Sequence, residues 1–128
     1  MAIKRIYDGF LPGRHEIEAY GSGGFRFGEI SHQGSILALP SGVHAWTVKS
    51  AKDVSEETLA PVFKEADALD LLLLGMGDIP YPIGESLRWR FREARIGVDV
   101  MQSAAAARTY NILLGEGRRV GAALIAVA

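Results

Sequence analysis

The run of leucines at residues 69–74 (LDLLLL) is the feature that most constrains the fold of this chain. The run is apolar at nearly every position instead of alternating, so it predicts a strand that is buried on both faces. Gly75 and Gly77 follow at once and predict an abrupt end to the strand. Strands of this kind are typical of parallel sheets that helices cover on both sides.

After residue 55 the sequence alternates between helical and extended patterns. Helices are predicted at residues 53–66, 84–94 and 103–114, and strands at residues 69–74, 98–101 and 120–128. In the second helix Ile83, Leu87, Phe91 and Ala94 form one apolar stripe, and Ser103 is expected to cap the third helix. The alternation predicts an α/β domain whose consecutive strands are largely parallel.

The first fifty residues favour β structure instead. Partly alternating runs at residues 16–20, 25–30, 35–39 and 43–48 are separated by turn segments that contain glycine. These runs predict antiparallel hairpins or a meander at one side of the domain. The sequence contains no repeat and no linker, so we expect residues 1–128 to form a single domain.

Composition excludes several classes of function. The chain has no cysteine, which excludes disulfides, thiolate catalysis and cysteine-ligated metal centres. Fourteen basic and fifteen acidic residues give a net charge of −1, and we therefore expect no nucleic-acid partner. The apolar residues 120–128 are too few to span a bilayer, and residues 1–6 lack the apolar run of a signal peptide. We expect a cytoplasmic protein without a membrane span.

The segment Gly75-Met76-Gly77 is the first candidate site. It follows a predicted central strand, and open α/β sheets bind their ligands at the carboxyl ends of such strands. Pro80 stands where a dinucleotide fingerprint requires its third glycine, and the carboxylate of Asp78 would repel a pyrophosphate. A tight turn is the simpler interpretation of this segment.

Arg108, Thr109, Tyr110 and Asn111 form the second candidate site, directly after four alanines in the third predicted helix. The alanines permit close packing on the sheet, so part of this polar block must be buried and hydrogen bonded. One interpretation is a cationic surface beside the Gly75–Gly77 loop that binds a carboxylate, a phosphate or a partner's backbone. The other is a purely structural network, which is the commoner case.

The remaining candidates carry weaker signals. The segment Arg88–Arg92 (RWRFR) indicates a solvated basic face with Trp89 available to a partner. His15, His32 and His44 match no metal-binding spacing, so we predict neither a metal nor a cofactor. No acid–base pair can be assembled from spacing alone, and we therefore predict no catalytic residue and favour a protein that is not an enzyme.

Four segments of the chain resemble signature blocks of the Mth938-like domain family. They are residues 71–77 (LLLLGMG), 97–101 (GVDVM), 105–111 (AAARTYN) and 116–125 (EGRRVGAALI). The resemblance covers nearly the whole chain and implies a three-layer α/β fold around a mixed central sheet. Met76, Ser103 and Ala107 depart from the threonine, threonine and cysteine that are frequent in the family.

The family includes mitochondrial complex I assembly factor 3, so the resemblance implies a non-enzymatic assembly or interaction factor. Its expected partners are subunits of respiratory complexes or of membrane-insertion machinery. The expected binding surface consists of Gly75, Met76, Gly77, Met101, Arg108, Thr109, Tyr110 and Asn111.

The alternative hypothesis is a protein that binds a small anionic ligand, or an unrecognised enzyme, using the crevice at the Gly75–Gly77 loop. In that case Arg108 would hold the anion, and Tyr110 or Asn111 would orient it. The chain is expected to be a monomer or a small homo-oligomer, with Trp46 and Trp89 as candidates for exposed interface residues.

Overall fold

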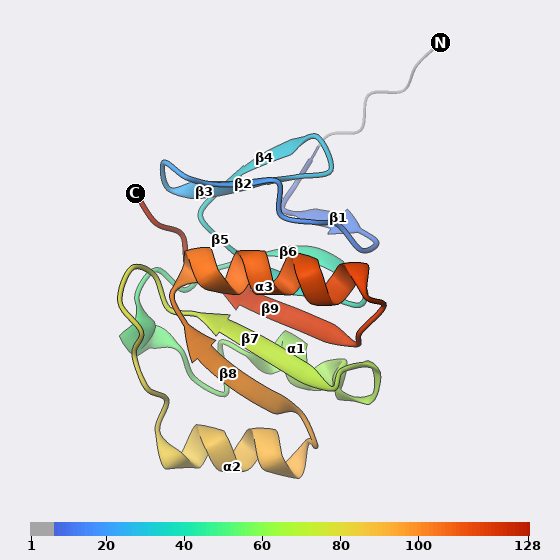
Figure 1. The fold of residues 1–128 in the computed structure, drawn as a ribbon. Helices are drawn as coiled ribbons and strands as arrows, with labels where there is room; N and C mark the ends of the chain where they lie inside the picture. Colours follow the sequence, from blue (N-terminus) through green and yellow to red (C-terminus); the bar gives the residue numbers. More distant parts are fainter. Residues whose placement is uncertain (1–6) are drawn as a thin grey trace.

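The strands of the computed structural model, which describes residues 7–128, form two separate sheets (Figure 1). The strands are β1 (Phe10–Pro12), β2 (Ala19–Gly21), β3 (Gly24–Phe27), β4 (Ile30–Gln33), β5 (Ser35–Leu39), β6 (Gly42–Trp46), β7 (Leu71–Gly75), β8 (Gly97–Met101) and β9 (Val120–Leu124). The helices are η1 (Ala51–Asp53), α1 (Ala60–Lys64), η2 (Ala66–Ala68), α2 (Glu85–Glu93) and α3 (Ser103–Gly115). The expectation about a signal peptide at residues 1–6 lies outside the described residues.

The larger sheet is mixed, as predicted, with the strand order β1-β6-β5-β9-β7-β8. Its second half is parallel, because β7 pairs with both β8 and β9 in the same direction, with Leu73 opposite Asp99 on one side and Ala122 on the other. Strand β9 joins this half to the antiparallel half through its pairing with β5. The smaller sheet contains β2, β3 and β4 in antiparallel order, so the predicted antiparallel pairing is confirmed. The predicted run at residues 25–30 is wrong in extent, because the chain turns at Gly28 and Glu29, where φ is positive, and β4 occupies the segment that was predicted to be a turn.

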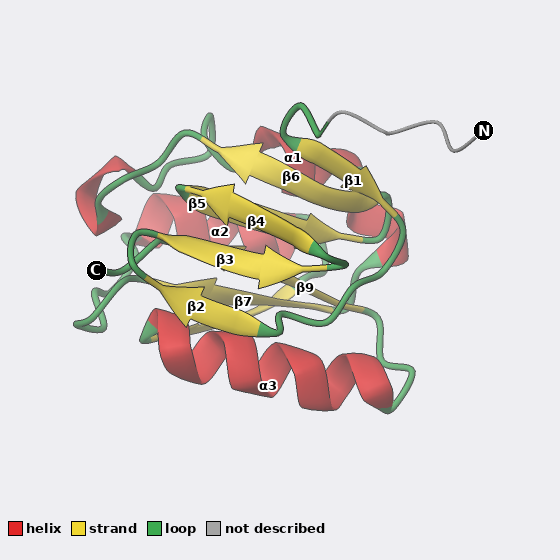
Figure 2. Cartoon of the chain, turned by 90° about the horizontal axis from the view of Figure 1, so that it is seen from above, coloured by secondary structure: helices red, strands yellow, loops and turns green. Residues whose placement is uncertain are grey.

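The molecule has three layers, with the larger sheet in the middle (Figures 1 and 2). Neighbouring side chains of β7 point to opposite faces, as in any strand. Leu72 and Leu74 therefore pack in one core with α1 and α2, whereas Leu73 packs in a second core with α3 and the smaller sheet. These two cores explain the leucine run, because a strand that is covered on both faces has no position for a solvated side chain.

The helix predicted at residues 53–66 is wrong in extent. The structure places a short 3-10 helix at η1, a turn, and then the single five-residue helix α1. Val54 interrupts the helix, because its backbone is extended. Ser55 and Thr58 then begin a new turn, since each side-chain oxygen accepts the backbone N–H of the other residue at 3.2 and 2.8 Å respectively, as in a capping box. Pro61 lies in the first turn of α1, where its missing N–H costs nothing.

Two further expectations are corrected by the structure. Trp46 is not exposed: it is buried beside α1, and its indole N–H donates to the carbonyl of Thr58 at 2.7 Å. The last strand ends at Leu124 instead of reaching residue 128, because its partner β7 already ends at Gly75. Within residues 7–128 every helix is too short or too polar to cross a membrane.

Candidate functional site

The loop Gly75-Met76-Gly77 lies at the carboxyl end of β7 and is buried. The N–H of Met76 donates to the carbonyl of Met101 at 2.9 Å, which joins the loop to the end of β8. A Cβ atom on Gly75 would lie 2.8 Å from the Cα of Ser103, so only glycine permits this approach of α3. Gly77 has a φ of +90°, a value that L side chains rarely adopt. Packing therefore requires glycine at position 75, and the backbone conformation favours it at position 77.

Ser103 holds this loop through its side chain. Its hydroxyl is fully buried, accepts the N–H of Gly77 at 2.9 Å and donates to the carbonyl of Ile125 at 2.6 Å. The prediction that Ser103 caps α3 is wrong, because both of these partners lie outside the helix. Gln102 is the N-cap residue, and its amide donates to the carbonyl of Asp78 at 2.7 Å.

A hollow of about 420 Å³ lies beside the loop. Met76, Gly77 and the carboxyl-terminal residues 125–128 line it, together with two side chains that stand out into solvent. These are Ile79, which is 75% exposed, and Tyr81, which is 51% exposed. Lys49 is the basic residue in the lining, and Arg108 does not belong to it.

The polar block of α3 divides between surface and interior. Arg108 is exposed, and its guanidinium donates to the hydroxyl of Tyr20 at 3.2 Å. Tyr110 is 1% exposed, and burial raises the pKa of its hydroxyl, an effect that nearby Arg14 opposes. Thr109 is half-buried on the same helix.

Asn111 holds the segment that precedes β2. Its carboxamide accepts the N–H of Ile17 and donates to the carbonyl of the same residue, both at 2.8 Å. A side-chain amide thus makes the same pair of hydrogen bonds to Ile17 that the backbone of a neighbouring strand would make. The structure therefore brings Arg108 and Asn111 to the junction between α3 and the N-terminal segment, and places Gly75, Met76, Gly77 and Met101 at the carboxyl end of the sheet.

Helix α2 presents the basic and aromatic face that the sequence indicated. Trp89 is 59% exposed, with the guanidinium of Arg92 5.1 Å from its ring. Arg90 instead makes intramolecular contacts. Its guanidinium lies 3.0 Å from the carboxylate of Glu56, and its guanidinium carbon lies 4.3 Å from the centre of the Phe63 ring. Leu87 and Phe91 of the predicted stripe are buried in the core.

The three histidines lie apart. His32 is buried, and its Nδ1 accepts the hydroxyl of Tyr7 at 2.7 Å, because its Nε2 must donate to a carbonyl on the other side. His15 contacts the carbonyl of Pro12. Burial lowers the pKa of both His32 and His44. Residues 7–128 contain no group of three side chains suited to hold a metal ion.

Ser41, His44 and Glu65 meet at the turn between β5 and β6, which the sequence analysis did not anticipate. The Oγ of Ser41 donates to Glu65 at 2.6 Å and lies 2.8 Å from the Nε2 of His44. A hydroxyl has one proton, so the imidazole must donate to the Oγ and cannot act as its base. The trio lacks the direction of hydrogen bonds that activates a serine nucleophile, and it joins the turn to the end of α1.

Sequence reasoning also missed the residues around the exposed loop at positions 78–84. Lys49 lies far from this loop in the sequence, and only the tertiary fold brings the two together. The one available signal was the spacing of Pro80 and Pro82 around Tyr81, because a proline on each side keeps an aromatic residue in an extended loop.

Comparisons with known proteins agree with this architecture. The family model described as a protein of unknown function (DUF498/DUF598) matches residues 17–125. A crystal structure of an outer membrane protein from Bartonella henselae is 43% identical, with a TM-score of 0.88 over 91% of this chain and 98% of that chain. The solution structure of a Mth938-like domain from Bordetella pertussis is 25% identical, with a TM-score of 0.79 over 96% and 92%.

A human protein resembles this chain as well. NADH dehydrogenase [ubiquinone] 1 alpha subcomplex assembly factor 3 from Homo sapiens is 30% identical over 109 residues, which is 85% of this chain. The chain spans 59% of the length of that human relative. The region matched by the DUF498/DUF598 family model, residues 17–125, includes the segments that carry both candidate sites.

Proposed function

Because this chain belongs to the DUF498/DUF598 family, we propose that it is a non-catalytic assembly or interaction factor that binds subunits of a respiratory complex. The similarity to the human complex I assembly factor carries this proposal, because it extends over 85% of this chain. Fold alone does not determine function, so the proposal also needs a surface on which a partner can bind.

We place that surface at the carboxyl end of the sheet and on the adjoining face of α3. The Gly75–Gly77 loop and Met101 form its rigid base, since their backbone groups are already paired. Arg108 supplies an exposed guanidinium that can bind a carboxylate or a backbone carbonyl of a partner. Thr109 lies next to it, while Tyr110 and Asn111 contribute by holding α3 in place.

Affinity co-purification from the native organism, with membranes solubilised, tests this function. We expect the wild-type chain to enrich subunits of respiratory complex I, and the Arg108→Glu variant to lose them. Arg118→Glu is the matched control, because Arg118 is also exposed but lies beyond the far end of α3. This control variant should retain the subunits.

Two outcomes would contradict the proposal. A wild-type preparation that is folded and contains no respiratory subunit would refute the assembly function. Equal capture by the Arg108→Glu and Arg118→Glu variants would leave the function in place and exclude Arg108 from the surface.

A further inference from the structure

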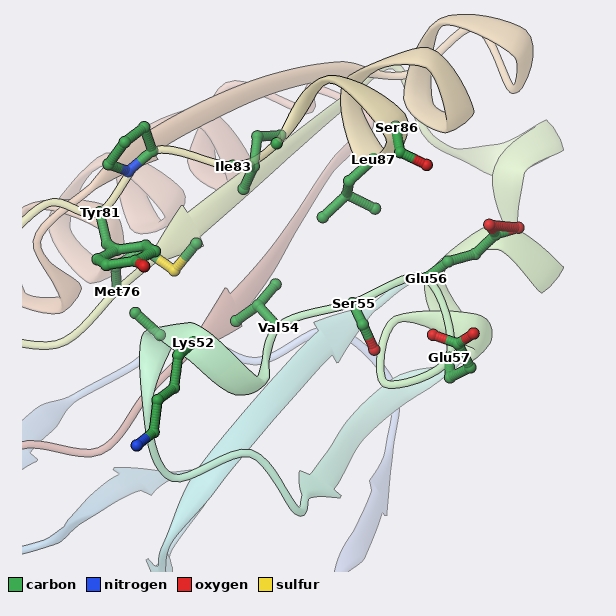
Figure 3. Close-up of a pocket in the computed structure, with 13 residues that line it drawn as sticks. Lys52, Val54, Ser55, Glu56, Glu57, Met76, Tyr81, Ile83, Ser86 and Leu87 are labelled. Atoms are coloured by element: carbon green, nitrogen blue, oxygen red, sulfur yellow. The ribbon is translucent and has the colours of Figure 1, made fainter.

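A second hollow of about 370 Å³ lies between the segment after β6 and the start of α2 (Figure 3). Its walls are apolar where they meet the core, with Val54, Met76, Ile83 and Leu87 pointing into it. Met76 and Leu87 are buried members of the core. The base of this hollow is therefore held by the packing of the whole domain.

Opposite charges stand on the two sides of this apolar base (Figure 3). Lys52 lies on the side of Tyr81, whereas Glu56 and Glu57 lie on the opposite side. The carboxylate of Glu56 is occupied by Arg90 at 3.0 Å. Among the described residues, neither Lys52 nor Glu57 takes part in an ion pair, and both are exposed.

This hollow lies next to the one beside the Gly75–Gly77 loop, because Ala51, Met76 and Tyr81 line both. We call the two neighbouring hollows together the edge groove, which extends from the start of α2 past Tyr81 to residues 125–128. The exposed Ile79 adds apolar surface to its wall.

We propose that the edge groove binds an extended segment of a partner protein in one direction. In this segment an acidic residue lies against Lys52, apolar residues cover Val54, Ile83 and Leu87, and a basic residue lies against Glu57. The charges on the two sides are opposite, so the reversed segment would place like charges together. This inference rests on the proposed function and specifies the chemistry of the partner.

Cross-linking from the groove tests the inference in the full chain. A photoreactive benzoyl-phenylalanine replaces Tyr81, and the variant is expressed and irradiated in the native organism. The same replacement of Phe10, which is exposed on β1 and lines neither hollow, serves as the control position. We expect the Tyr81 position to capture a segment in which mass spectrometry finds apolar residues between an acidic and a basic one.

A peptide with the captured sequence then tests the charges. We expect Lys52→Glu to weaken its binding by about tenfold or more, which corresponds to the loss of roughly 1.4 kcal/mol. Changing the acidic residue of the peptide to lysine should restore binding to this variant. Lys64→Glu, an exposed position on α1 outside the groove, should leave the affinity unchanged.

The outcomes separate this inference from the proposed function. Respiratory subunits that co-purify without any cross-link from the Tyr81 position would overturn the groove and leave the function standing. A captured segment without the charge pattern, or a charge exchange that restores nothing, would also overturn it. A patterned segment with successful exchange, taken from a protein unrelated to respiratory complexes, would support the groove and refute the proposed function.

Discussion

The hydroxyl of Ser103 lies where β7, β9 and α3 meet. It accepts the N–H of Gly77 and donates to the carbonyl of Ile125, and no part of the residue is exposed. Both backbone groups lie past the ends of their strands, where the sheet no longer supplies partners. The hydroxyl oxygen of Ser103 therefore supplies the hydrogen-bond partner that each of these two buried backbone groups needs at the carboxyl end of the sheet.

Replacement of Ser103 by alanine should lower the free energy of unfolding by about 2–3 kcal/mol, since it leaves two buried backbone groups without a partner. Urea denaturation followed by circular dichroism measures this change. Ser31→Ala is the control, because Ser31 is exposed on β4, and its effect should stay within about 0.5 kcal/mol. Equal effects of the two substitutions would contradict the role given to Ser103.

At the scale of elements, the strands of the smaller sheet pair only with one another within residues 7–128, so side chains and connecting segments attach this sheet to the rest of the molecule. Its side chains Phe25 and Phe27 enter the core beneath α3, and Asn111 holds the backbone of Ile17 just before β2. Strands β7 and β9, by contrast, lie inside the larger sheet with a neighbour on each side. Regions with fewer buried contacts open locally before the whole molecule unfolds.

The substitution Asn111→Leu should release the smaller sheet selectively. Loss of two hydrogen bonds of about 1 kcal/mol each predicts that amides of β2–β4 exchange with solvent deuterium roughly ten to thirty times faster. Amides of β7 and β9 should change much less. Thr109→Ala, at a half-buried position on the same helix, serves as the control. A uniform increase in every strand would show that Asn111 stabilises the whole molecule instead.

For the molecule as a whole, the free energy of unfolding depends on pH through two histidines, the buried His32 and the half-buried His44. Burial lowers the pKa of His32 below the usual 6.5, and it lowers the pKa of His44 as well. The unfolded chain therefore binds protons at a higher pH than the folded one. Stability is fully present above about pH 6.5 and is lost as the pH falls from there toward the folded-state pKa values.

The variant His32→Gln should reduce this loss of stability. Urea denaturation at pH 8, 7, 6 and 5 should show a smaller decrease below pH 6.5 than in the wild type. Burial also raises the pKa of Tyr7, so its hydroxyl stays protonated throughout this range and continues to donate to position 32. An unchanged pH dependence in the variant would exclude His32 as a source of the effect.

Local sequence determined the elements whose apolar residues either recur with a helical period or form an uninterrupted run. The sequence predicted β7 from its leucines and α2 from the stripe of Leu87 and Phe91, because burial requires apolar residues at this spacing. The glycines that follow the leucines predicted the end of β7. The family resemblance added the three layers and the mixed sheet. The extent predicted for the first helix was wrong, because the extended backbone at Val54 and the new start at Ser55 and Thr58 leave no mark in the apolar pattern.

Tertiary structure decided what the polar residues do. Asn111 and Ile17 are 94 positions apart, and Ser103 meets backbone groups 22 and 26 positions away. Lys49 and Lys52 likewise join Tyr81 only after the chain has folded around β7 and α2. A polar side chain carries no periodic signal for its partner, because hydrogen bonds and charge pairs depend on positions in space that the whole fold sets.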